Sequence, residues 1–88
     1  IPHMGWNNVE AINSKYLNSQ KKSDYYFIHS YHFVPKVESV ISGLVNYGEQ
    51  YVASIEYQNI FATQFHPEKS QSEGLSLIQK FVSINVKD

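Results

Sequence analysis

A histidine, a proline, a glutamate and a lysine follow one another at positions 66–69, and the histidine and glutamate could do acid–base chemistry. The largely apolar run at residues 60–65 leads into them, as a strand does when it carries charged side chains at its C-terminal tip. Residues two apart in an extended chain point to the same side, so we expect His66 and Glu68 to face one another. Pro67 keeps His66 out of helical dihedrals. A carboxylate in this position would orient one imidazole nitrogen and leave the other as a general base.

The same pair also has a purely structural interpretation, in which His66 closes the end of a strand beside a solvated Glu68. The position favours chemistry, because α/β folds place reactive groups where a strand ends and a helix follows. A general base needs a group to deprotonate, and the chain contains no cysteine. A thiol nucleophile, a disulfide and a thiolate–metal site are therefore excluded within these residues.

A second histidine, His29, lies within an apolar stretch and has two interpretations. In the first, it is a core histidine that is hydrogen-bonded to a neighbour. In the second, Ser30 and Tyr31 line a pocket with their backbone groups, and His29 lies beside that pocket.

A metal site is the least favoured alternative. His29 and His32 are three residues apart, so on a strand they face opposite sides and make poor co-ligands. Such a site would need both of them together with His66 and Glu68. We expect no metal and no cofactor.

Composition narrows the class of protein. The chain has 88 residues and a net charge of −1, which allows one small domain or a piece of a larger one. Its basic residues are all lysines and form no stripe, so nucleic-acid binding has little support. Apolar runs stay well short of the roughly 18 residues that span a membrane. The chain begins without an initiator methionine, and we expect a truncated N-terminus, with a processed end as the alternative.

The first part of the chain predicts a loop and two strands. Residues 2–10 read as a loop that enters a short strand at 6–10, and residues 11–24 as a weak helical turn followed by a surface loop. Residues 25–34 are aromatic and β-branched almost throughout, which predicts a strand covered on both faces.

The middle of the chain predicts antiparallel structure with short connections. Residues 39–47 and 51–57 flank a turn that contains Gly48, which is typical of a hairpin. We expect Tyr51, Ala53, Ile55 and Tyr57 to share one face. A second tight turn at Gln58-Asn59 precedes a strand at 60–65.

The end of the chain predicts a helix over residues 71–84. Ser70 and Glu73 have the spacing of a capping box at its start. Four apolar residues recur with helical period and form an apolar stripe: Leu75, Ile78, Phe81 and Val82.

Three strings of this sequence, PHMGWN, YYFIHSY and IFATQFHPEKSQSEGL, together resemble the C-terminal half of a class I (triad-type) glutamine amidotransferase. Within that class they are most similar to the glutaminase subunits of imidazole glycerol phosphate synthase, from histidine biosynthesis. The string QFHPE marks the class, and PHMGWN together with HSY narrows it to the histidine-pathway members. The resemblance covers the chain from residue 2 to about residue 81.

The resemblance implies an α/β fold of flavodoxin-like type with a mostly parallel central sheet. Residues 1–88 would form the C-terminal half of that domain, strand-rich with one C-terminal helix, and the half that carries the nucleophile would lie upstream. The family uses a cysteine–histidine–glutamate triad. His66 matches the histidine that activates the cysteine, and Glu68 matches the glutamate that orients it. Ser30 and Tyr31 match the segment whose backbone helps to hold the substrate glutamine.

The resemblance also implies a partner, a TIM-barrel cyclase subunit that forms a heterodimer with the glutaminase and receives its ammonia. Met4, Trp6, Tyr26 and Lys69 match positions that face this partner and the ammonia passage. The implied enzyme is cytoplasmic and binds neither nucleic acid nor membrane. Two alternatives stay open: a non-catalytic module that binds the cyclase barrel, and another class I amidotransferase.

Overall fold

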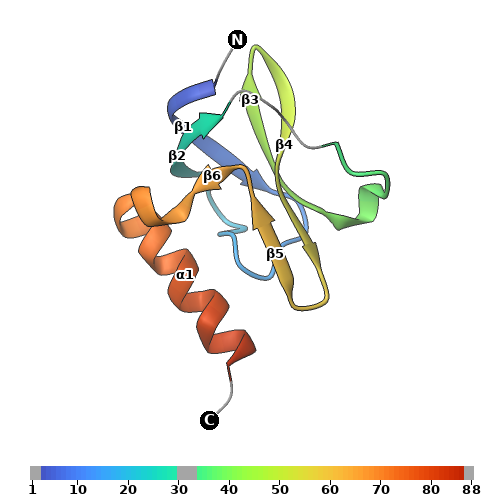
Figure 1. Ribbon diagram of the computed structural model, residues 1–88, viewed down its shortest axis with the longest axis vertical. Coiled ribbons are helices and arrows are strands. Elements are labelled where there is room, and N and C mark those ends of the chain that lie inside the picture. The colour runs from blue at the N-terminus through green and yellow to red at the C-terminus, as the bar shows by residue number, and fades with distance from the viewer. Residues whose placement is uncertain (1–2, 30–33, 87–88) are drawn as a thin grey trace.

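The computed structural model describes residues 3–29 and 34–86, without the side chains of His3 and His29. The described residues form six strands, two short 3-10 turns and one α-helix (Figure 1). The strands are β1 (His3–Ala11), β2 (Ser23–His29), β3 (Ile41–Tyr47), β4 (Glu49–Tyr57), β5 (Ile60–Thr63) and β6 (Phe65–His66). The 3-10 turns are η1 (Glu38–Val40) and η2 (Pro67–Lys69), and the α-helix is α1 (Gln71–Asn85). Along these residues no helix is long and apolar enough to cross a bilayer.

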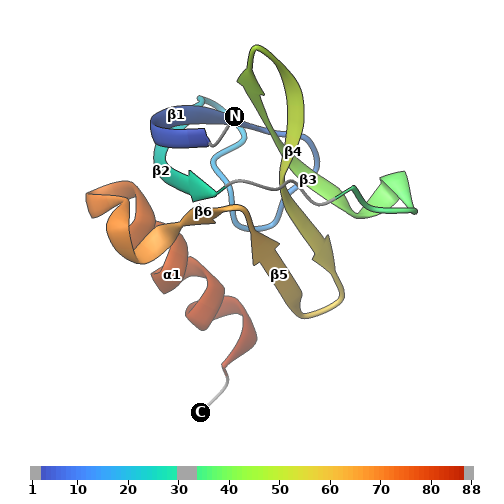
Figure 2. The ribbon, with the colours of Figure 1, turned by 45° about the horizontal axis from the view of Figure 1, so that its top comes forward.

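The strands form one sheet in the order β5-β4-β3-β1-β2-β6, and every pairing among the described strands is antiparallel. The two strands at opposite ends of this order, β5 and β6, are joined in sequence through Gln64 alone. The sheet must therefore curl until its two edges approach, and Figure 2 shows the end of β5 leading directly into β6 at this corner. The Gln64 backbone N–H donates a 2.8 Å hydrogen bond to the carbonyl of Ala53 in β4, which holds this corner.

The predicted hairpin and the second tight turn are confirmed. Strands β3 and β4 pair directly through a turn at Gly48, whose φ of +78° is a conformation that glycine adopts without strain. Gln58 and Asn59 form the turn between β4 and β5. Of the four residues expected to share one face of β4, Ala53 is buried and Tyr57 is exposed.

The first strand is longer than predicted. Sequence signals at Gly5 and the neighbouring asparagines indicate a loop, yet β1 runs from His3 to Ala11. It pairs with β2 along one side and with β3 along the other, and this pairing outweighs the weak local preference for strand. Gly5 takes a φ of +108° within it.

The weak helical turn expected after β1 is wrong. The described residues between β1 and β2 form bends instead. The Ser14 hydroxyl accepts hydrogen bonds from the backbone N–H groups of Tyr16 and Leu17, and donates one to the Glu56 carboxylate in β4. This loop is therefore tied to the sheet, and it buries Tyr16 and Leu17 in the core.

Strand β2 is covered on one face, not on both. Tyr25 and Phe27 are buried, whereas Ile28, which points the other way, is 41% exposed. The alternation arises because the described part of the sheet packs its core against one face only. Val34 lies outside the strand and is exposed, and residues 30–33 of the predicted strand are outside the described residues.

The core lies between the buried face of the sheet, the loop after β1 and α1. Tyr25 and Phe65 stack with ring centroids 4.2 Å apart, which joins β2 to β6. Such an aromatic pair contributes about 0.5–1.5 kcal/mol beyond its buried area. The fully buried apolar residues are Val9, Tyr16, Leu17, Tyr25, Phe27, Val45, Ala53, Phe65 and Leu77.

Helix α1 is confirmed at its predicted position but packs a different face. Leu77 and Gly74 are buried and Phe81 is half-buried, with the Phe81 ring 5.1 Å from that of Tyr16. The contact is set by Gly74, because a Cβ there would lie 1.8 Å from the Pro67 carbonyl oxygen. Of the predicted stripe only Phe81 packs inward; the exposed members are Leu75, Ile78 and Val82.

Candidate functional site

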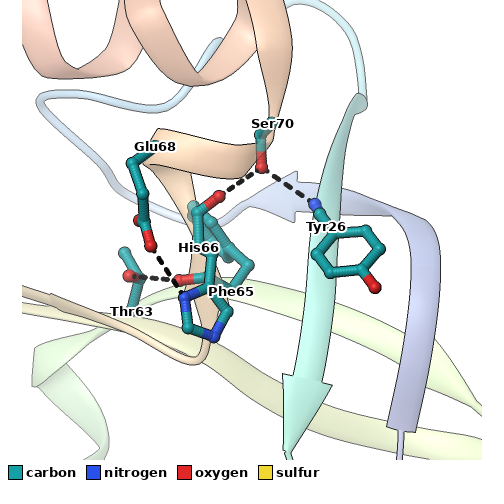
Figure 3. A network of polar contacts seen from close by, with 6 residues as sticks. All are labelled: Tyr26, Thr63, Phe65, His66, Glu68 and Ser70. Atoms are coloured by element: carbon teal, nitrogen blue, oxygen red, sulfur yellow. Dashed lines mark hydrogen bonds and ion pairs between the residues drawn. The ribbon is translucent and has the colours of Figure 1, made fainter.

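His66 and Glu68 are in contact, as the sequence predicts. His66 ends β6, and its Nδ1 lies 2.9 Å from Oε2 of Glu68 (Figure 3). The route to this contact differs from the prediction. His66 is extended, with φ −102° and ψ 98°, but Pro67 then opens the 3-10 turn η2, which folds Glu68 back toward the ring. The proline thus separates an extended residue from a helical turn.

The contact favours the ionised form of Glu68. The hydrogen bond with the His66 ring lowers the pKa of the Glu68 carboxyl, and a backbone hydrogen bond adds to this effect. The ionised carboxylate can only accept, so the His66 ring donates from Nδ1. The neutral tautomer that makes this hydrogen bond has its lone pair on Nε2, which is the nitrogen available to accept a proton.

The pair lies at the surface of the described structure. The His66 side chain is 37% exposed and that of Glu68 is 60% exposed. A base in this state has an orienting carboxylate and room for an incoming group, but the described residues do not enclose it. The arrangement can accept a proton from a nucleophile that approaches Nε2.

Ser70 holds the turn that carries Glu68, and this role was missed by the sequence analysis. We expected its side chain to cap α1, and that prediction is wrong. The Ser70 hydroxyl instead donates a 2.6 Å hydrogen bond to the His66 carbonyl and accepts a 2.9 Å one from the Tyr26 N–H (Figure 3). These two bonds use the single donor of the hydroxyl and one of its two acceptor lone pairs, and the Ser70 side chain makes no capping hydrogen bond to α1.

The residues predicted to face a partner gather on the outer face of β1 and β2. Trp6 pairs with Tyr26 across the two strands, and their rings meet edge to face with centroids 5.8 Å apart. Met4 is 61% exposed and Trp6 is 49% exposed. Met4 pairs with Ile28, an exposed residue that the period-two alternation from Tyr26 could have identified. Opposed residues of an antiparallel pair share a face, so these four form one apolar patch, in which Met4, Trp6 and Ile28 are exposed and Tyr26 is half-buried.

This patch continues to the candidate base. Tyr26 is opposed to His66 in the pairing of β2 with β6, which places both on the same face of the sheet. Lys69, the remaining predicted partner residue, is exposed in the turn η2 directly after Glu68. Met4, Trp6 and Tyr26 thus lie on the face of the sheet that carries His66, and Lys69 lies in the turn that follows His66.

Two predicted elements of the site lie outside the described residues. Ser30 and Tyr31, expected to hold substrate, fall within the segment 30–33. Of the four residues in the metal hypothesis, His32 and the side chain of His29 are also outside the description. Among the described residues, no three His, Cys, Asp or Glu side chains are grouped so that they could hold a metal ion.

The curled antiparallel sheet ends in a histidine–glutamate pair, and a helix follows at once. The profile of the family described as "Glutamine amidotransferase class-I" matches residues 1–84. The chain belongs to this family, a family of enzymes, and the resemblance drawn from QFHPE is confirmed. The described residues are strand-rich with one C-terminal helix, as predicted.

Three curated relatives of this chain are named as subunits of imidazole glycerol phosphate synthase. The chain is 48% identical over 86 residues to "Imidazole glycerol phosphate synthase subunit HisH 1" of Campylobacter jejuni (strain RM1221). The matched region covers 96% of this chain and 42% of the relative. It is 46% identical over 86 residues to subunit HisH of Pelagibacter ubique, covering 96% of this chain and 41% of the relative. For subunit HisH of Aquifex aeolicus the identity is 49% over 83 residues, with 92% and 40% covered. The chain spans about two-fifths of the length of these relatives.

Proposed function

We propose that this chain supplies the general base and the orienting carboxylate of a glutaminase that feeds ammonia to imidazole glycerol phosphate synthase. The observation that carries the proposal is the 2.9 Å contact between His66 Nδ1 and Glu68 Oε2 at the end of β6. Membership of the class I amidotransferase family and the names of the relatives support it. In this proposal residues 1–88 are the C-terminal half of the domain of a cytoplasmic biosynthetic enzyme.

The proposed reaction uses side chains of this chain together with a thiol that the chain does not contain. His66 Nε2 takes the thiol proton, and the thiolate attacks the side-chain carbonyl carbon of glutamine. The imidazolium, stabilised by Glu68, then protonates the departing nitrogen, and ammonia leaves. Water attacks the resulting glutamyl thioester with His66 again as base, which releases glutamate and restores the thiol. Ser30 and Tyr31 are the proposed backbone contacts to glutamine.

The proposed partner is the TIM-barrel cyclase subunit, which would receive the ammonia. The apolar patch of Met4, Trp6, Tyr26 and Ile28 supports this, because aromatic residues and methionine are enriched where proteins meet. Lys69 adds a positive charge in the turn that follows His66. Since Tyr26 and His66 share a face, a partner on the patch would lie beside the point at which ammonia is released.

The test uses a chimaera in which this chain replaces the residues that it matches in the Campylobacter jejuni relative. Together with the cyclase subunit of the same synthase, we expect the chimaera to release glutamate from glutamine. The isolated chain should release none above a His66→Ala control, since loss of the nucleophile alone costs about 10⁶ in kcat in subtilisin. Glutamate production is measured by a coupled dehydrogenase assay.

Two outcomes would count against the proposal. Glutamine hydrolysis by the isolated chain, absent from its His66→Ala variant, would mean that no external thiol is needed. A chimaera that binds the cyclase but hydrolyses no glutamine would favour the alternative of a non-catalytic binding module, for which the apolar patch alone is sufficient.

A further inference from the structure

We propose that Ser70 is a positioning residue for the His66–Glu68 pair, an inference that rests on the proposed function. Ser70 is 1% exposed, and its hydroxyl bridges two strands at the position where they carry the site. It donates to the His66 carbonyl at 2.6 Å and accepts from the Tyr26 N–H at 2.9 Å. The hydroxyl therefore links the backbone of the candidate base to the backbone of the apolar patch, as Figure 3 shows.

The backbone of Ser70 closes the same turn. Its N–H donates to the Pro67 carbonyl at 3.0 Å, and its carbonyl accepts from the Gly74 N–H at 3.2 Å. Residues 66–70 thus form a loop fixed at both ends, because the Ser70 hydroxyl returns to the carbonyl of His66. Glu68 is the middle residue of this loop. Its carboxylate reaches Nδ1 of His66 only while the loop keeps its shape.

Helix α1 leaves no space in which this loop could rearrange on that side. A Cβ at Gly74 would lie 1.8 Å from the Pro67 carbonyl oxygen and 2.9 Å from Ser70 Cβ. Removal of the hydroxyl would leave the Tyr26 N–H and the His66 carbonyl without this shared partner. Buried polar groups regain a partner where they can, so we expect β6 and the turn to shift and move the His66 ring.

The expected effect is on the chemical step. A displacement of about 1 Å at a catalytic group can cost on the order of 10²-fold in rate, and we expect loss of the Ser70 hydroxyl to lower kcat for glutamine hydrolysis by about tenfold or more. Glutamine binding depends on other residues in this account, so KM should change less than about twofold. A residue that serves stability alone would not produce this division between kcat and KM.

The experiment compares Ser70→Thr with Ser70→Val in the chimaera with its cyclase. Both variants add the same methyl group, and only threonine keeps the hydroxyl, so the pair isolates the hydrogen bonds from the added bulk. We expect the threonine variant to hydrolyse glutamine at a rate near that of the unsubstituted chimaera. We expect the valine variant to show the lowered kcat with unchanged KM. Ser70→Ala, which adds no atom, replaces the valine variant if valine prevents folding.

Equal kcat in the threonine and valine variants, whether both are active or both impaired, would overturn the inference. So would a valine or alanine variant in which KM rises and kcat is kept. Inactivity of the unsubstituted chimaera is a different result, because it would overturn the proposed function itself and this inference with it.

Discussion

Replacement of His66 by alanine in the chimaera is expected to lower glutamine-dependent synthesis by about 10⁴-fold or more while synthesis from added ammonium is retained. His66 is the only group of this chain that the proposed mechanism uses to move protons, and it acts in every step. The cyclase does not need that base once ammonia is supplied directly. The measurement is the rate of imidazole glycerol phosphate formation with each nitrogen source in turn.

The control for His66→Ala is Ser72→Ala, which changes an exposed residue of the same segment at the start of α1. This variant should retain both activities. If His66→Ala lost the ammonium-dependent activity as well, the histidine would be needed for folding or for docking of the cyclase, and its proposed role as a base would lose its support.

Replacement of Glu68 by glutamine is expected to lower kcat for glutamine hydrolysis by about 10²–10⁴-fold, as loss of the orienting carboxylate does in other triads. Glutamine keeps the shape of the side chain, but it can present an N–H to the His66 ring and so favour the wrong tautomer. Substrate binding does not use Glu68, so KM should stay close to that of the unsubstituted chimaera. Steady-state glutamate release at several glutamine concentrations gives both constants.

The pH range for this comparison follows from the pKa of Glu68. The pKa of Glu68 is lowered in the folded state, chiefly by the hydrogen bond with His66. The contact between the ionised carboxylate and the ring is therefore fully formed at any pH above the ordinary pKa of glutamate. It is lost only as the pH falls through the lowered value. At neutral and mildly alkaline pH the comparison therefore reports removal of a carboxylate that is fully ionised in the unsubstituted protein.

The matched control for Glu68→Gln is Glu49→Gln. Glu49 is an exposed glutamate at the start of β4, so its substitution by glutamine makes the same chemical change at a distance from the site. Glu49→Gln should keep full activity. A Glu68→Gln variant as active as the Glu49 variant would show that the contact with His66 is structural, which is the alternative that the sequence leaves open.

The contact between His66 and Glu68 could be predicted from the sequence because it depends on local geometry. Pro67 restricts its own φ and the conformation of His66, and the two side chains are only two residues apart. The prediction used an extended chain, whereas the structure uses a 3-10 turn, and both bring the two groups together. Pairing of β3 with β4 was equally accessible, since a Gly-containing turn and the flanking strands specify it.

Other features depend on partners distant in the sequence and could not be predicted in this way. Ser70 has the sequence context of a capping box. Its hydroxyl, however, accepts its hydrogen bond from the backbone N–H of Tyr26, 44 residues away, and not from a helix amide. In α1 the apolar residues can form more than one stripe. The close approach at Gly74 selects the face that carries Leu77, a choice that counting apolar residues does not reveal.

The apolar residues left exposed are also informative about the limits of sequence reasoning. Strand β2 was expected to be covered on both faces because it is apolar throughout, but burial needs a second layer that the described residues do not provide. Its outer face holds Tyr26 and Ile28 beside Trp6 and Met4. The apolar run of β2 therefore indicates which residues are suited to burial, but it does not indicate what covers them.

The central claim is that His66 of this chain serves a cysteine supplied by another part of the domain. The most direct test is the pH dependence of iodoacetamide alkylation of the chimaera, with the modified cysteine located by peptide mass spectrometry. A thiol beside a histidine ionises well below the usual value of about 8.5. We predict that the nucleophilic cysteine is alkylated at a correspondingly low pH and that His66→Ala shifts its profile upward toward about 8.5. The same profile with and without His66 would contradict the account.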